Sequence, residues 1–242
     1  MPIPQHINSD RASGEFQWSG TDTQARWDEN WKNKNNRDFL RNLRDFKYHY
    51  NSHGFRTAEF TDEACILALG CSHTEGVGVP IVNTWPSVLE TQSNNTVYNL
   101  GVGGAGIDTV YRLLIHYAIE LNTLAVVINV PPAVRFEIKT EVEWETVSVH
   151  SSNQSHFMKT WFLHDENSDL HQEKTVAAIQ WFCYLNDIPL TLVYADDEQY
   201  IDKTTKFNQG RDLMHHGKQY HCNVATAIHS QLKQQFDQNN MQ

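Results

Sequence analysis

The 242-residue sequence has no apolar run that approaches the roughly 20 residues needed to span a bilayer, so we expect no membrane-spanning helix. Its first ten residues have neither a basic n-region nor an apolar h-region, and we expect no secretory signal and a cytoplasmic location. Basic residues are few: 19 Lys and Arg stand against 29 Asp and Glu, a formal net charge of -10 with His neutral. Phosphate contacts need a basic face, so the balance argues against nucleic-acid binding, although it leaves room for a local basic patch.

The cysteines are few and contain no C-x-x-C pair. A chain of this size does not need a disulfide framework, and the spacing gives little support to structural zinc. The 13 histidines include no H-x-x-x-H pair on a predicted helix with a third ligand nearby. We therefore expect free thiols and no metal site. The cysteines are Cys65, Cys71, Cys183 and Cys222.

Hydrophobic residues nevertheless make up 40% of the chain, enough for a packed core. Residues 1–60 differ from the rest, because they are rich in Asn, Asp, Arg and Trp and have almost no aliphatic run. We predict that 1–60 is a polar arm that packs its aromatic side chains on a main domain at 61–242. A helix at 23–31 would place Trp27 and Trp31, four residues apart, on one face.

From residue 64 onward, short apolar runs alternate with amphipathic segments. Strands are predicted at 64–69, 96–100, 124–130 and 189–194, and helices at 108–121, 175–186 and 216–234, with a further helix beginning near Thr84 and a β-hairpin at 135–150. This alternation predicts an α/β fold, a three-layer αβα sandwich with a central, mostly parallel sheet. Chemistry in such sheets collects at the carboxyl ends of the strands.

Three segments at those ends carry candidate catalytic residues. Ser72 follows the first strand and its glycine, where a tight turn would expose the hydroxyl. The glycine-rich stretch 101–106 follows the second strand and offers unobstructed amides. It lacks the G-x-G-x-x-G spacing of a nucleotide site. Finally, Asp212 precedes His215 by three residues, a spacing that lets a carboxylate orient an imidazole.

These segments, in this order, resemble the SGNH (GDSL-type) hydrolase family over roughly residues 64–235. The family's first block is a strand followed by Gly-Asp-Ser, and residues 70–72 (Gly-Cys-Ser) are similar to it. Its second block, Asn-x-Gly-x-x-Gly, is similar to residues 99–104, and its last, Asp-x-x-His, to Asp212 and His215.

The resemblance implies a flavodoxin-like SGNH hydrolase fold and a serine esterase that needs no cofactor. Ser72 would be the nucleophile, His215 the general base and Asp212 the group that orients it. The amides of Ser72 and Gly104 would form the oxyanion hole. The substrate would be a small acyl ester, acetyl for example, on a carbohydrate or another small alcohol, and the charge of -10 favours a neutral acylated glycan over an anionic polymer.

The sequence departs from the family pattern at two places. Cys71 stands where the family has Asp; it could itself be a nucleophile beside His73, although free cysteines are more often simply buried. The third block, Gly-x-Asn-Asp, is missing, so Asn129 is either a shifted third oxyanion donor or only a strand-end residue. His73 and Arg135 are candidates for substrate contact; the alternatives are a solvated loop residue for the first and an ion pair with Glu137 for the second.

Two other functions stay open. One is O-acyl transfer to a sugar, because residues 51–56 (Asn-Ser-His-Gly-Phe-Arg) resemble segments of SGNH-like proteins associated with polysaccharide acylation. The other is a non-catalytic glycan-binding or structural protein that has kept the fold, which the missing third block favours.

Overall fold

Four parallel strands form the central sheet of the computed structural model, which describes residues 9–141, 144–148, 156–162, 164–194, 200 and 208–239. The strand order is β4-β3-β5-β8. The chain leaves β3 toward β4 on one side and then returns to β5 on the other, so the topological switch point lies beside β3. The strands are β3 (Cys65–Gly70), β4 (Thr96–Asn99), β5 (Thr123–Val130) and β8 (Leu190–Tyr194).

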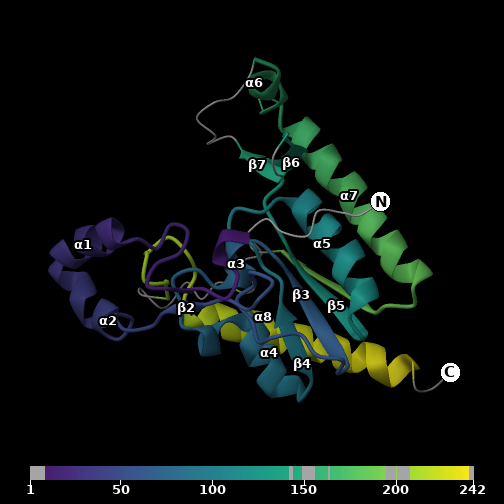
Figure 1. Ribbon diagram of the computed structural model, residues 1–242, viewed down its shortest axis with the longest axis horizontal. Coiled ribbons are helices and arrows are strands. Elements are labelled where there is room, and N and C mark those ends of the chain that lie inside the picture. The colour runs from purple at the N-terminus through teal and green to yellow at the C-terminus, as the bar shows by residue number, and fades with distance from the viewer. Residues whose placement is uncertain are drawn as a thin grey trace.

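Helices cover both faces of this sheet (Figure 1). α5 (Ile107–Glu120) and α7 (Asp165–Leu185) pack on one face, and α4 (Trp85–Ser93) and α8 (Lys218–Asn239) on the other. Successive side chains of β3 alternate between two buried apolar clusters, one under each helix pair, as the period of two in a strand requires. The three-layer αβα sandwich predicted from the sequence is therefore confirmed.

Element boundaries agree with the prediction to within a few residues, except for α7. The sequence predicts a helix from 175, but α7 begins at Asp165. Residues 165–174 are mostly polar and show little apolar periodicity, which hides the first turns. They are held by contacts with other segments: His171 Nε2 lies 2.9 Å from Asp108 Oδ1, and the Gln172 side chain donates to the Pro131 carbonyl at 2.7 Å.

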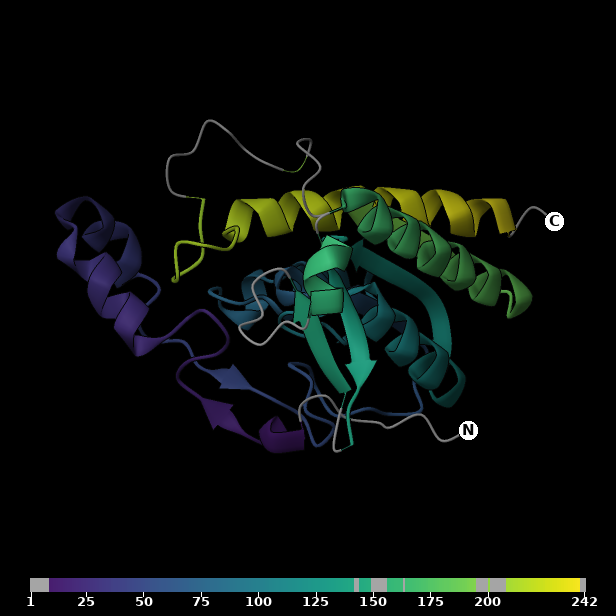
Figure 2. The ribbon, with the colours of Figure 1, turned by 90° about the horizontal axis from the view of Figure 1, so that it is seen from above.

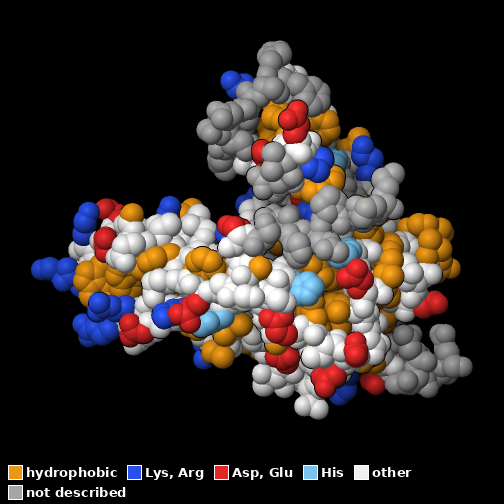
Figure 3. All heavy atoms as spheres, viewed as in Figure 1, with side chains coloured by type: hydrophobic (Ala, Val, Ile, Leu, Met, Phe, Trp, Pro, Cys, Tyr) orange, Lys and Arg blue, Asp and Glu red, His pale blue; other side chains and the backbone are white. Residues whose placement is uncertain are grey.

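The N-terminal arm places its α-helices at one end of the molecule in both ribbon views (Figures 1 and 2). Its two strands pair antiparallel, and Lys and Arg side chains gather at the far end of its helices (Figure 3). Its elements are η1 (Ser9–Arg11), β1 (Glu15–Phe16), α1 (Gln24–Lys32), η2 (Lys34–Asn36), α2 (Arg37–Arg41) and β2 (Tyr48–His49).

The predicted tryptophan face exists on α1. Trp27 and Trp31 stack with ring centroids 5.4 Å apart, and Trp18 lies 6.3 Å from Trp27. Thr23 is the N-cap, and its side chain accepts from the Arg26 amide at 3.2 Å. These aromatic rings pack largely against one another, and Trp18 also lies over the guanidinium of Arg211 in the main domain.

The predicted hairpin is also present: β6 (Arg135–Lys139) pairs antiparallel with β7 (Trp144–Ser148). Residues 142–143 and 149–150 of the predicted hairpin lie outside the described residues. Together with α6 (His156–Phe162) the hairpin projects beyond the sheet (Figure 1). Two short elements complete the fold, α3 (Ser72–Glu75) and η3 (Ile81–Asn83). Among the described residues, none of the helices combines the length and apolarity that crossing a membrane requires.

Candidate active site

Ser72 lies on a tight turn at the carboxyl end of β3. The turn needs Gly70, whose φ of +153° is unfavourable for other residues and whose added Cβ would lie 2.3 Å from Thr74 Oγ1. Ser72 is the first residue of α3, so its amide has no acceptor within that helix. The preceding Cys71 is buried in an apolar cluster, as expected of a small free cysteine.

The side chains of Ser72, His215 and Asp212 form one continuous hydrogen-bonded chain. His215 Nε2 lies 2.8 Å from Ser72 Oγ, and His215 Nδ1 lies 2.7 Å from Asp212 Oδ2. An ionised carboxylate can only accept, so Nδ1 carries the proton and Nε2 is left to accept from the serine hydroxyl. The neighbouring His216 stacks instead on Tyr220, with ring centroids 4.2 Å apart.

Asp212 is buried and held in its ionised form. Burial alone would raise its pKa, but the hydrogen bond and charge of His215, with the Thr21 hydroxyl, outweigh burial and lower the pKa to about 2. Its second oxygen, Oδ1, accepts from the amides of Met214 and His215, each at 3.1 Å. The carboxylate is therefore fixed by four donors and stays charged at neutral pH.

The glycine-rich loop after β4 leaves one amide free. Within the described part of the chain, four of the five amides from Gly101 to Ala105 donate to protein acceptors, and the Gly104 amide does not. Gly104 has a φ of +81°, is exposed, and has open space where a Cβ would be. The acceptors of the other four amides are Asn99 Oδ1, the Gly70 carbonyl, Glu75 Oε2 and the Val102 carbonyl.

Glu75 ties this loop, α3 and the arm together, a role that sequence reasoning misses. Its side chain is 1% exposed, and Oε2 accepts from the Gly103 amide at 2.6 Å. Oε1 accepts from three arm residues, at 3.2, 3.1 and 2.6 Å in the order Arg11, Ser19 and Tyr50. Burial and the nearby carboxylate raise the pKa of the Tyr50 hydroxyl, so it remains a donor.

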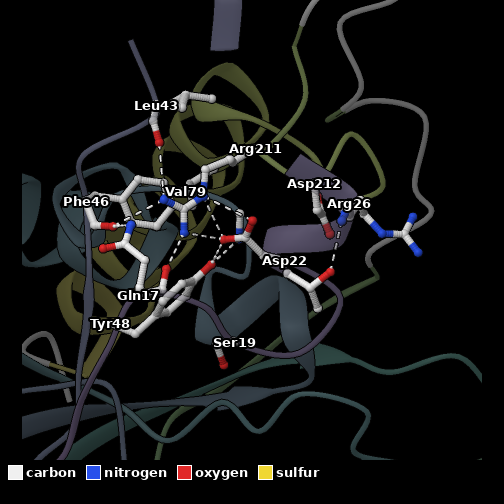
Figure 4. Close-up of polar contacts among 12 residues, drawn as sticks. Gln17, Ser19, Asp22, Arg26, Leu43, Phe46, Tyr48, Val79, Arg211 and Asp212 are labelled. Atoms are coloured by element: carbon white, nitrogen blue, oxygen red, sulfur yellow. Dashed lines mark hydrogen bonds and ion pairs between the residues drawn. The ribbon is translucent and has the colours of Figure 1, made fainter. Parts of the chain in front are cut away.

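The arm also holds the segment that carries Asp212. The Thr21 hydroxyl donates to Asp212 Oδ2 at 2.6 Å, and Asn30 donates to the Asp212 carbonyl at 3.2 Å. The Arg211 guanidinium, one residue before Asp212, donates to Asp22 Oδ2 at 2.6 Å (Figure 4). It also lies over the rings of Trp18 and Phe46, 4.2 and 3.9 Å from their centroids. No local sequence pattern could reveal these contacts, because about 190 residues separate the partners.

His73 lies against the His215 imidazole rather than in solvent. Its ring centroid is 5.2 Å from that of His215 and 5.2 Å from that of His216. Burial, followed by repulsion from His215 and His216, lowers the pKa of His73 to about 3. Its buried Nδ1 has no hydrogen-bond partner among the described residues. His73 is thus neutral at physiological pH.

The two remaining candidates lie at the edges of the site. Asn129 pairs with Gly70 across β3 and β5, and its Nδ2 donates to the Tyr220 hydroxyl at 3.4 Å. Its role as a third oxyanion donor stays a prediction. Arg135 donates to the Ala105 carbonyl, at the limiting distance of 3.5 Å, whereas Glu137 pairs with Arg112. The expected alternative for Arg135, an ion pair with Glu137, is therefore replaced by a contact with the glycine loop.

The run at 51–56 contributes structure behind Ser72. Arg56 is 1% exposed and donates to the carbonyls of Glu75, Gly76 and Val79 at the end of α3. Across the described ranges, no three His, Cys, Asp or Glu side chains are grouped so that they could hold a metal ion.

A scan against protein-family models finds no match, and a search of curated proteins finds none either. Solved structures with a similar arrangement include a GDSL-like lipase from Bacteroides thetaiotaomicron, with a TM-score of 0.38 and 14% identity over 70% of this chain and 88% of that one. A member of the lipolytic G-D-S-L family from Veillonella parvula has a TM-score of 0.37 and 12% identity, over 67% and 94%. A protein from Desulfitobacterium hafniense assigned to the same family has a TM-score of 0.38 and 14% identity, over 69% and 98%.

These neighbours come from the family that the sequence motifs resemble. Because their TM-scores are below 0.5, they carry no argument about the fold or the activity of this chain. The fold assignment rests on the order and direction of the strands in this chain.

Proposed function

We propose that this protein is a serine esterase that hydrolyses small acyl esters through an acyl-enzyme. The observation that carries the proposal is the hydrogen-bonded chain from Ser72 Oγ through His215 to the ionised Asp212. Nucleophile, base and orienting acid lie within hydrogen-bond reach of one another, which is the geometry that nucleophilic acyl transfer requires.

In the first half-reaction, Ser72 Oγ attacks the ester carbonyl carbon while His215 Nε2 takes the hydroxyl proton. The carbonyl oxygen becomes an oxyanion, for which the amides of Ser72 and Gly104 are the available donors. Asp212 holds the imidazole in place and stabilises its positive charge. When the tetrahedral intermediate collapses, the alcohol leaves with the proton from Nε2, and the acyl group stays on Ser72.

In the second half-reaction, water attacks the acyl-enzyme and gives its proton to His215 Nε2. The intermediate then releases the carboxylic acid, and the proton returns to Ser72 Oγ. Every proton is moved by the one imidazole, so besides the chain's own residues the cycle needs only water. Loss of a third oxyanion donor would cost about 2.7–4 kcal/mol of transition-state stabilisation, which slows such an enzyme without silencing it.

The substrate we propose is a small acyl ester, of acetyl size, on a neutral carbohydrate or another small alcohol. Ser72 is only 9% exposed, which favours a small acyl group. His73, next to Ser72 in the chain, and Arg135, at the glycine loop, are polar groups suited to hydrogen-bonding an alcohol or sugar. Because His73 is neutral, it would offer a sugar hydroxyl a hydrogen bond without a charge.

Hydrolysis of p-nitrophenyl acetate tests the proposal. We expect wild type to release p-nitrophenol, and Ser72→Ala and His215→Ala each to lose at least about 10³-fold in kcat, as removal of a triad member does elsewhere. Ser93→Ala is the matched control, because Ser93 lies at the end of α4 and belongs to no part of the site. Turnover that survives both triad substitutions would overturn the mechanism.

A second assay separates hydrolysis from acyl transfer. Acetate and acetylated product are measured while a neutral sugar is added as acceptor. We expect acetate to remain the main product at every sugar concentration. If acylated sugar replaces acetate in proportion to added sugar, the protein is a transferase using the same triad; if folded protein shows neither product, the non-catalytic alternative is favoured.

A further inference from the structure

We propose that Thr21 of the N-terminal arm is a positioning residue of the active site, which holds the Asp212 carboxylate in the geometry that His215 needs. This inference rests on the proposed esterase function. Thr21 lies 191 positions before Asp212 in the sequence, in a segment outside the three motifs that carry the family resemblance.

The contact is short and is made to the atom that matters. Thr21 Oγ1 lies 2.6 Å from Asp212 Oδ2, the same oxygen that accepts from His215 Nδ1 at 2.7 Å. Thr21 Oγ1 also lies 3.4 Å from His215 Nδ1, so it closes a triangle with the two triad atoms. Hydrogen bonds to a charged acceptor are about twice as strong as neutral ones, which gives this hydroxyl real influence on the carboxylate.

Two consecutive arm residues hold two consecutive residues of the triad segment. Thr21 holds Asp212, and Asp22 holds Arg211 through bonds to Nε and Nη2 at 2.6–3.0 Å. The Asp22 carboxylate is itself fixed by the Tyr48 hydroxyl at 2.6 Å. Thr21 is thus placed by a buried ion pair one residue away, and its position is set independently of the site that it supports.

The remaining donors cannot replace it. The Met214 and His215 amides bind Oδ1 and belong to the same short segment as Asp212, so they orient the carboxylate only relative to its own backbone. Thr21 comes from a distant segment and fixes Oδ2 relative to the arm. Without the hydroxyl, Oδ2 keeps only the bond from His215, and the carboxylate and imidazole can rotate together away from Ser72.

The test compares Thr21→Val with Thr21→Ser. Val keeps the shape but loses the donor, whereas Ser keeps the donor. We expect Thr21→Val to lower kcat for p-nitrophenyl acetate about tenfold, equivalent to about 1.4 kcal/mol, with KM unchanged, and Thr21→Ser to restore most of the rate. The matched control is Thr23→Val, which removes the α1 cap two residues away without touching the triad; it should lower Tm but leave kcat as in wild type.

A second readout does not depend on turnover. The proton on His215 Nδ1 in a short bond to a carboxylate gives a far-downfield proton resonance. In the inactive Ser72→Ala background, we expect this line to shift or broaden in Thr21→Val and to return in Thr21→Ser.

The two proposals fail in different ways. If Ser72→Ala retains full activity, the esterase mechanism is wrong. If Ser72→Ala is inactive while Thr21→Val keeps the wild-type kcat and the wild-type resonance, the mechanism stands and the role of Thr21 is wrong. Equal loss of rate in Thr21→Val and Thr21→Ser would also overturn it, because the hydroxyl would then not be the cause.

Discussion

The Arg211 guanidinium donates to both carboxylate oxygens of Asp22, at 2.6–3.0 Å, and both side chains are at most 1% exposed. The other guanidinium nitrogen donates to three backbone carbonyls of the arm, those of Leu43, Arg44 and Phe46. This ion pair joins the arm to the segment immediately before Asp212 (Figure 4). The arm is therefore part of the structure that holds the candidate active site, not an independent appendage.

Removing one charge of this pair is expected to be strongly destabilising. Asp22→Asn leaves the Arg211 charge buried without its partner, and we predict a loss of about 3–5 kcal/mol in the free energy of unfolding, measured with urea. The matched control is Asp28→Asn on the exposed side of α1, expected to change stability by no more than about 0.5 kcal/mol. Equal stabilities for the two variants would show that the pair does not fasten the arm.

Asp212→Asn should retain the fold and lose the activity. An amide can donate to His215 Nδ1, which favours the wrong tautomer, and it cannot stabilise the imidazolium. We predict a fall in kcat of about 10⁴-fold for p-nitrophenyl acetate, with Tm within a few degrees of wild type. A fall of less than about tenfold would mean that His215 does not depend on this carboxylate.

Glu75→Gln should weaken the junction between arm and glycine loop. The amide presents one oxygen where the carboxylate presents two, so either the Gly103 amide or the donors on the other oxygen lose an acceptor. We predict a loss of about 1.5–3 kcal/mol in the free energy of unfolding. Glu63→Gln, at an exposed position, is the control and should stay within about 0.5 kcal/mol of wild type; a Glu75→Gln variant as stable as this control would contradict the structural role.

Stability should fall at acid pH because His73 resists protonation. Its pKa is lowered from 6.5 to about 3, so between these values the unfolded state binds a proton that the folded state does not. The free energy of unfolding is therefore unaffected by His73 above pH 6.5 and falls by about 1.4 kcal/mol per pH unit as the pH falls from 6.5 toward 3. His221 acts with the same sign, because complete burial also lowers its pKa.

We therefore expect His73→Phe to flatten the dependence of unfolding free energy on pH between about 4 and 6 by one proton. Urea unfolding at a series of pH values measures this slope. Parallel curves for wild type and His73→Phe would show that His73 protonates equally in both states.

Local patterns predict most of the fold. The four sheet strands are continuous apolar runs. Ser72 follows the first of them closely, and Asp212 and His215 follow the last. The structure brings those three side chains together as the order of parallel strands requires. Local patterns also predict the tryptophan face of α1, from the four-residue spacing of its tryptophans, and the hairpin after β5, from alternating charged and apolar residues.

The rest depends on contacts between distant segments. Glu75 reads as a loop carboxylate beside the nucleophile, and only the folded arm reveals its three arm donors. Thr21 lies in a polar stretch with no motif, and its partner is 191 residues away. The sequence does not predict the early start of α7 for a related reason. The first turns of this helix depend on partners in other segments rather than on an apolar stripe of their own.

The most direct test of Ser72 as the nucleophile is reaction with a fluorophosphonate, followed by mass spectrometry of the peptides. We predict a single covalent adduct on Ser72 in wild type and in Cys71→Ala, and none in Ser72→Ala. Labelling that persists in Ser72→Ala, or folded wild-type protein that takes up no label, would contradict it.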